Sequence, residues 1–143
     1  MTSRSVPAAA LASLLNQVAR RMHSQAHTLD LFPAQWAALR YMAKMPPAQR
    51  TSSDLARFQG QEHGSVARTV RTLIDKGYLK PAGPAGRGRA TALEVTEAGH
   101  VLLSQDPLLK VESVFSQFDD GERETIARFL EATIRNLQGE GPK

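Results

Sequence analysis

The residues best suited to specific chemistry in this sequence are four polar side chains in one helical stretch. They are Ser65, Arg68, Arg71 and Thr72. The same stretch carries apolar residues at the spacing of one buried stripe, namely Val66, Val70, Leu73 and Ile74. At about 100° per residue, the polar residues fall opposite this stripe or on its flank. Such hydroxyl and guanidinium groups can bond base edges and phosphates, so this surface is typical of a recognition helix in a major groove.

The place of each side chain along the helix suggests its role. Ser65 and Arg68 stand toward the helix start, the end that reaches base edges, and we expect them to read the sequence. Arg71 and Thr72 lie further along and are expected to contact phosphates.

A second pair of cations, Arg87 and Arg89, stands in a glycine-rich segment between two short strand patterns. The first pattern is residues 78–80 and the second is residues 89–95, with PAGPAGRG between them. This arrangement predicts a β-hairpin with both arginines at its tip. A glycine-rich tip can approach phosphates closely, and an arginine there can enter a narrow minor groove.

Capping residues delimit the elements that must position these groups. Thr51 or Ser52 can cap a helix whose inner face carries Leu55, Ala56 and Phe58, and Gly60 ends that helix. The recognition helix starts near Glu62 and stops at Gly77. Thr96, followed by Glu97, predicts another helix start behind the hairpin. The sequence thus predicts a helix-turn-helix followed by a wing.

Several segments of this region are typical of one family. They are Leu55-Ala56, Val66 with Arg68, Val70 and Leu73, the run from Asp75 to Leu79, and Arg89-Ala90 leading to Val95-Thr96-Glu97-Ala98-Gly99. With them the chain resembles, over nearly its whole length, the MarR-type (multiple antibiotic resistance regulator) winged-helix transcription factors. The resemblance implies a mainly α fold with a small β-hairpin wing and with N- and C-terminal dimerisation helices. It also implies a dimeric repressor of a pseudo-palindromic operator, released by a small-molecule effector.

One position departs from the family pattern. Family members commonly have an aspartate two residues before the wing arginine, which braces the wing, whereas this chain has Arg87 there. Two cations across Gly88 repel each other, so we expect a wing that is mobile until phosphates compensate the charge. On this reasoning, Arg87→Asp would pair with Arg89 and stiffen the free wing.

Amphipathic helices flank the winged region. Residues 8–31 and 97–138 are expected to supply dimerisation helices around a winged helix-turn-helix at residues 33–96, with a tail at 139–143, all in one domain. Pro33 suits a helix start, Asp106-Pro107 predicts a restart, and Asp119 with Glu122 predicts a capped final helix. One small winged body cannot cover so many apolar helix faces, which favours a twofold dimer.

Candidate small-molecule and metal sites are weaker. Trp36, Arg40 and Tyr41 could line a pocket for a small aromatic or anionic effector, as the resemblance implies, although core packing explains Trp36 better. His23 and His27 have the spacing of a metal-ligand pair, but the sequence supplies no further ligands nearby. No catalytic array or cofactor motif stands out, so we expect neither an enzyme nor a bound cofactor.

Charge distribution agrees with a nucleic-acid partner. Residues 57–89 hold seven Lys/Arg against Glu62 and Asp75, a local +5 within a chain whose net charge is +4. There are no cysteines, and no long apolar run or signal peptide is found, which favours a cytoplasmic protein without membrane contact. Two alternatives stay open: a small-molecule or metal sensor with weak DNA binding, and an architectural DNA-binding protein. Arg68 and Arg89 argue against the first, and the single recognition helix disfavours the second.

Overall fold

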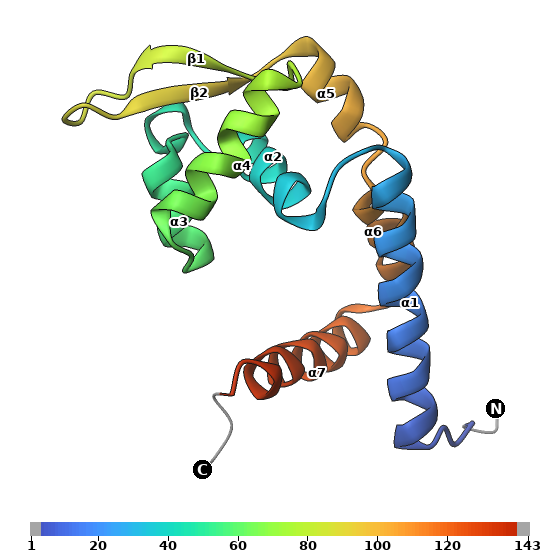
Figure 1. The fold of residues 1–143 in the computed structure, drawn as a ribbon. Coiled ribbons are helices and arrows are strands. Elements are labelled where there is room, and N and C mark those ends of the chain that lie inside the picture. The colour runs from blue at the N-terminus through green and yellow to red at the C-terminus, as the bar shows by residue number, and fades with distance from the viewer. Residues whose placement is uncertain (1–3, 140–143) are drawn as a thin grey trace. The chain divides into compact units, whose positions relative to one another are not determined.

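The computed structural model describes residues 4–139, which form seven α-helices, a short 3-10 turn and a two-stranded hairpin (Figure 1). In chain order the elements are α1 (Ala8–Thr28), α2 (Pro33–Lys44), η1 (Pro47–Gln49), α3 (Ser52–Gln59), α4 (His63–Asp75), β1 (Leu79–Pro84), β2 (Thr91–Val95), α5 (Glu97–Leu103), α6 (Pro107–Phe115) and α7 (Asp120–Leu137). Residues up to Pro107 make one compact unit, and those from Leu108 onward make another. Within residues 4–139, no helix has both the length and the apolarity to cross a membrane.

The core of the first unit lies where α2, α3, α4 and the base of the hairpin meet. Its fully buried side chains are Leu31, Trp36, Leu39, Met42, Leu55, Val66, Leu73 and Leu79. The predicted stripe on α4 contributes Val66, Val70 and Leu73 to this core, while Ile74 packs at its margin. Burial of this stripe fixes the rotation of α4 about its axis, so the opposite surface faces outward.

In the helix-turn-helix, a side-chain cap marks the start of α3, and glycines in the left-handed conformation follow the ends of both α3 and α4. The hydroxyl of Thr51 accepts a hydrogen bond from the backbone N–H of Asp54 at 3.1 Å and begins α3. Gly60 ends α3 at φ +63°, and Gly77 follows α4 at φ +82°. After Gly77, the N–H of Tyr78 donates to the carbonyl of Leu73 at 2.9 Å. This bond is typical of the Schellman motif, in which a glycine follows the end of a helix. The predicted helix boundaries are therefore confirmed.

The wing is an antiparallel hairpin in which Leu79 pairs with Val95 and Pro84 with Thr91. β1 extends to Pro84, further than the predicted 78–80, with an irregularity between Pro81 and Pro84. Tip bonds join the N–H of Ala85 to the carbonyl of Ala90 at 2.9 Å, and the N–H of Ala90 to that of Arg87 at 3.3 Å. A bond at the base joins the wing to the helical body.

That base bond runs from the N–H of Leu93 in β2 to the carbonyl of Arg50, just before α3, at 2.7 Å. On the other side, α5 begins with Thr96, whose hydroxyl accepts from the N–H of Gly99 at 3.1 Å. A Cβ on Gly99 would lie 2.4 Å from the carbonyl oxygen of Tyr78, so only glycine fits this contact between α5 and the hairpin. The predicted cap at Thr96 is confirmed, and close packing against Tyr78 explains why residue 99 is a glycine.

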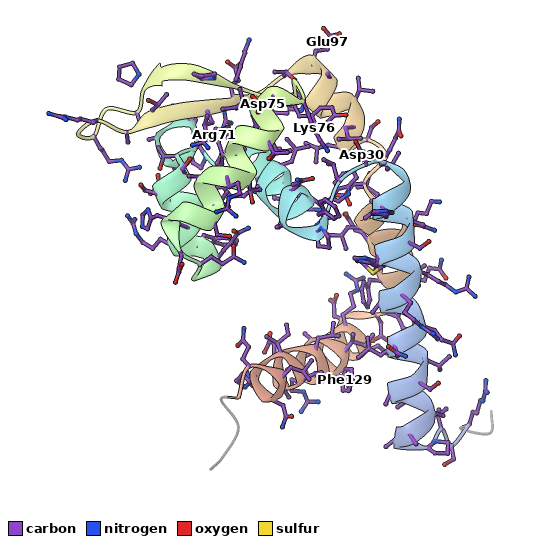
Figure 2. All side chains as sticks on the ribbon, in the orientation of Figure 1. Asp30, Arg71, Asp75, Lys76, Glu97 and Phe129 are labelled. Carbon is purple, nitrogen blue, oxygen red and sulfur yellow. The ribbon has the colours of Figure 1, made fainter. Side chains whose placement is uncertain are left out.

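The outer helices keep apolar residues exposed. On α1 these are Leu11, Leu14 and Val18, at 45–52% exposure, because only the C-terminal part of this helix packs against α2 (Figure 1). On α7, which begins with the predicted Asp119–Glu122 capping box, none of the residues is buried. Phe129, labelled in Figure 2, is 47% exposed, and Ile134 is 55% exposed.

Three expectations from the sequence need correction or restriction. The first helix ends at Thr28 and not at 31, because Asp30 adopts a left-handed φ of +59° and Leu31 turns into the core. Phe58 was expected on the inner face of α3, but it is 69% exposed and contacts Tyr41 at the surface, with ring centroids 5.1 Å apart. Of the expected tail at 139–143, residues 140–143 lie outside the described residues.

Candidate nucleic-acid interface

The outer surface of α4 presents the side chains that the sequence singled out. Ser65, Arg68 and Arg71 are exposed, and Thr72 is half-buried on the flank (Figure 2 labels Arg71 on α4). The hydroxyl of Thr72 donates to the carbonyl of Arg68 at 3.0 Å, so its oxygen remains able to accept a hydrogen bond. Burial of the opposite stripe therefore brings the four predicted residues to one accessible surface.

The arginines of this surface carry uncompensated charge. Among residues 4–139, no acidic side chain forms an ion pair with Arg68, Arg71 or Arg89. Free guanidinium groups on an exposed helix face can bond phosphates or the O6 and N7 atoms of guanine. The surface is therefore electrostatically suited to a nucleic acid.

Gly64 makes the start of α4 unusually open. Nothing lies within 4 Å of a Cβ built at this position, so the glycine is not required by packing within the protein. A small residue here allows the backbone of the first turn to come close to whatever binds the surface.

Arg87 corrects an expectation. Its guanidinium is not left to repel Arg89, because one of its nitrogens, Nη2, donates to Oδ2 of Asp54 at 2.5 Å and to the carbonyl of Ala48 at 2.7 Å. Asp54 belongs to the first turn of α3, 33 residues earlier in the chain. The charge of Arg87 is therefore compensated within the protein, before any phosphate is present.

Asp54 is the buried centre of a small polar network. Its Oδ2 also accepts from the hydroxyl of Thr51 at 2.7 Å, and its Oδ1 accepts from Arg57 at 3.4 Å. The hydrogen bond from Thr51, followed by that from Arg87, lowers the pKa of the Asp54 carboxyl below its ordinary value, against the opposing effect of burial. Asp54 is thus held ionised.

A cavity of about 310 Å³ opens between α1 and α2 in the first unit. It is lined by Ala19, Met22, His23, Ala26, Pro33, Trp36, Arg40 and Pro107. Two of the three predicted effector residues, Trp36 and Arg40, belong to this lining. Within residues 4–139, the indole Nε1 of Trp36 is buried without a hydrogen-bond acceptor.

Tyr41 is not part of that cavity. Its hydroxyl donates to the carbonyl of Gln49 at 3.0 Å, and it lines a separate depression with Asp54 and Arg87. Burial, and then the negative charge of Asp54, raises the pKa of the Tyr41 hydroxyl. The structure therefore separates Tyr41 from Trp36 and Arg40.

The histidine pair on α1 gains no further ligands. His23 lines the cavity, whereas the His27 ring lies beside Phe32 with centroids 5.9 Å apart. In the part of the chain that the structure describes, no group of three or more His, Cys, Asp or Glu side chains is arranged for a metal ion.

Two contacts of this region were missed by sequence reasoning. One is the Asp54–Arg87 pair. The other joins Lys76, at the end of α4, to the turn after α1, where its Nζ donates to the carbonyl of Asp30 at 2.6 Å (Figure 2). Thr51 followed three residues later by Asp54 indicates an acid at a helix start, but no local pattern identifies a partner this far along the chain.

Comparison with known proteins agrees with this architecture. Residues 29–90 match the model of the MarR family. The transcriptional regulator AdcR of Streptococcus pneumoniae is 26% identical over 94 residues, which cover 62% of this chain and 64% of that regulator. A solved structure of MarR is 27% identical, with a TM-score of 0.61 and 99% coverage of both chains. The S. aureus MepR–DNA complex shares the fold at 16% identity, with a TM-score of 0.68 over 94% of this chain and 99% of that one.

The fold and the exposed basic surface thus define a winged helix-turn-helix protein. Within this class the chain is similar to MarR-type proteins, in agreement with the resemblance of its sequence. The family is one of transcription regulators and not of enzymes, in agreement with the expectation from the sequence.

Proposed function

We propose that this chain is a sequence-specific DNA-binding transcription regulator, which acts as a dimeric repressor on a pseudo-palindromic operator. The observation that carries the proposal is the outer surface of α4, where Arg68 and Arg71 are exposed and unpaired among the described residues. In support, a relative with the same fold was solved as a complex with DNA.

The division of labour follows the geometry of groove recognition. Ser65 and Arg68 contact base edges, because they stand in the first half of α4. Arg71 and Thr72 contact phosphates further along the helix. Arg89 extends from the wing to the neighbouring minor groove.

A dimer accounts for the apolar faces of the outer helices. Residues 8–30 and 119–137 expose large apolar side chains in the structure, including Leu14 on α1 and Phe129 on α7. Exposed apolar stripes of this kind are typical of helices that are covered by a partner. A second copy related by a twofold axis would cover them and place two recognition helices about 34 Å apart, one turn of DNA.

The cavity between α1 and α2 suits a small aromatic effector. Its lining is mainly apolar, and it includes Trp36, whose buried Nε1 lacks an acceptor among residues 4–139. A ligand that accepts this hydrogen bond would satisfy the indole. We infer that such a ligand binds preferentially to a protein conformation with weakened DNA affinity and so releases the operator.

Selection of bound sequences from a random duplex pool tests the proposed function. Purified protein should enrich an inverted repeat whose half-sites are centred about one helical turn apart. A pool selected with Arg68→Ala serves as the control and should lose information at the bases that Arg68 reads. Enrichment of no motif by the wild-type chain would contradict sequence-specific regulation.

A further inference from the structure

The wing tip is fastened to the start of α3 by a single side chain. Arg87 reaches from the tip to two oxygen acceptors, the carboxylate of Asp54 and the backbone carbonyl of Ala48. These acceptors stand on either side of the α3 N-terminus. A guanidinium that bonds two fixed acceptors of one segment is restrained in both distance and direction.

Asp54 is a rigid anchor for this contact. Its side chain is only 9% exposed, and Thr51 and Arg57 bond it from within α3 and its cap. A buried carboxylate that loses a charged partner is left with a desolvation cost, so the free energy favours keeping Arg87 in place. The side chain of Arg87 is 52% exposed, so its contact with Asp54 lies at the surface of the first unit.

The contact complements a second attachment nearer the base of the hairpin. There, the N–H of Leu93 bonds the carbonyl of Arg50. A hairpin held at its base alone can swing about that point, whereas attachment at both base and tip fixes its direction. Arg89, two residues beyond Arg87, forms no ion pair among residues 4–139 and is exposed.

We propose that Arg87 is a positioning residue, which holds the wing against α3 through Asp54 and Ala48 so that Arg89 is presented to DNA. The inference rests on the proposed DNA binding. A wing that is already ordered loses less conformational entropy on binding than a mobile one. Here the bracing acid lies on α3 and the bracing base in the wing, and Arg89 is left free for the nucleic acid.

Amide hydrogen exchange in the free protein tests the brace directly. The N–H groups of Ala85 and Ala90 are bonded across the tip, so their exchange reports opening of the wing. Arg87→Ala should speed their exchange about tenfold or more, while the matched variant Arg89→Ala should leave it unchanged. Equal rates in the wild type and Arg87→Ala would overturn the proposal.

A reversed charge gives a sharper version of the same experiment. Arg87→Asp places a second carboxylate beside Asp54, and like charges repel. Exchange at Ala85 and Ala90 should therefore be faster than in Arg87→Ala, whereas pairing of the new aspartate with Arg89 would slow it. Slower exchange in Arg87→Asp than in Arg87→Ala would show that a contact within the wing holds it in place, and it would contradict the role of Asp54.

Salt titration of DNA affinity separates positioning from direct contact. Arg89→Ala should reduce the slope of log affinity against log salt by about one, because a phosphate contact is lost. Arg87→Ala should weaken binding with little change in slope. A reduction by about one in Arg87→Ala would identify Arg87 as an ordinary phosphate contact and overturn its assignment as a positioning residue.

Hydrogen exchange in the free protein and titration with DNA test the two proposals independently. If the wild-type chain bound no duplex, the proposed function would be wrong, and exchange in the free protein would still decide whether Arg87 holds the wing. Asp54→Asn provides a second variant for the brace. It should accelerate exchange at the tip, and adding Arg87→Ala to it should accelerate exchange little further, because both substitutions remove the same contact. Independent, additive effects would overturn the proposal.

Discussion

Arg40 donates two hydrogen bonds to the carboxylate of Asp106, from Nε and Nη2, each of 2.6 Å. The bond joins the middle of α2 to the residue that precedes α6, and the Asp106 side chain is only 8% exposed. The same guanidinium lies 5.5 Å from the centroid of the Trp36 ring. The cation at the cavity wall is therefore already compensated, which favours an aromatic ligand over one bound by charge alone.

Removing the guanidinium should destabilise the first unit. Arg40→Ala leaves the Asp106 carboxylate buried without this partner, at a cost of about 1–3 kcal/mol in the free energy of unfolding. Arg40→Lys should cost less, because it keeps the charge but loses the two-pronged bond. Urea denaturation measures both. Equal stability of Arg40→Ala and wild type would show that the pair contributes nothing net.

Arg68 should discriminate between DNA sequences. Arg68→Ala is expected to weaken binding to the selected site by about 1–3 kcal/mol and to relax sequence preference, because a base-edge contact is lost. Arg71→Ala, a matched loss of one cation on the same helix, should weaken binding to all duplexes similarly. Titrations on specific and random DNA make the comparison, and equal losses for Arg68→Ala on both would mean that it contacts phosphate.

Gly99 should tolerate no side chain. A methyl group there meets the carbonyl of Tyr78 and the side chain of Val95, so Gly99→Ala should lower the free energy of unfolding by about 1–3 kcal/mol. Gly64→Ala is the control, since open space surrounds that position and alanine favours a helix. Thermal denaturation should show opposite signs for the two, while Gly64→Ala weakens DNA binding. A harmless Gly99→Ala would contradict the tight contact.

The carboxyl of Asp54 should make stability fall in acid. Its pKa is lowered in the folded protein, so its stabilising effect is complete above the unfolded value, about 3.9, and is lost as pH falls through the folded value. Asp54→Asn should therefore be least stable relative to wild type near neutral pH, and the difference should shrink below about pH 4. Asp75→Asn, exposed on α4, is the control. A difference that does not vary with pH would count against this role.

Charge on the apolar face of α7 should prevent dimerisation. Phe129→Glu places a carboxylate among side chains that we expect a partner to cover, whereas Val101→Glu alters a residue of similar exposure on α5. Sedimentation at micromolar concentration should show a dimer for wild type and Val101→Glu and a 15.6 kDa monomer for Phe129→Glu. A monomeric wild-type protein would contradict the proposed dimer.

The sequence predicted the elements of the winged region because their ends are marked by local chemistry. Thr51, Thr96 and Asp119 accept hydrogen bonds at helix starts, and Gly60 and Gly77 adopt the left-handed conformation at helix ends. The apolar period of α4 was equally informative, since it determines which side chains face outward. These features depend on residues within one turn of each other.

Contacts between distant segments were beyond such reasoning. The sequence placed Arg87 beside Arg89 but gave no means of placing it beside Asp54, because that requires the direction of the whole hairpin. Phe58 fits the period of a buried face, yet α3 is so short that its last turn extends past the core. Tyr41 and Trp36 lie on one helix but line different cavities, because the walls of each cavity come from segments that are distant in the sequence.

The two prolines of β1 have a consequence for how the protein behaves at high concentration. A protruding two-stranded ribbon normally offers edges to which strands of other molecules can add. Pro81 and Pro84 lack backbone N–H groups, and the irregularity between them interrupts the regular ladder of β1. On β2, the N–H of Leu93 is already taken by Arg50. The wing is thereby protected against edge-to-edge aggregation, and what it offers to its surroundings is the side chains at its tip.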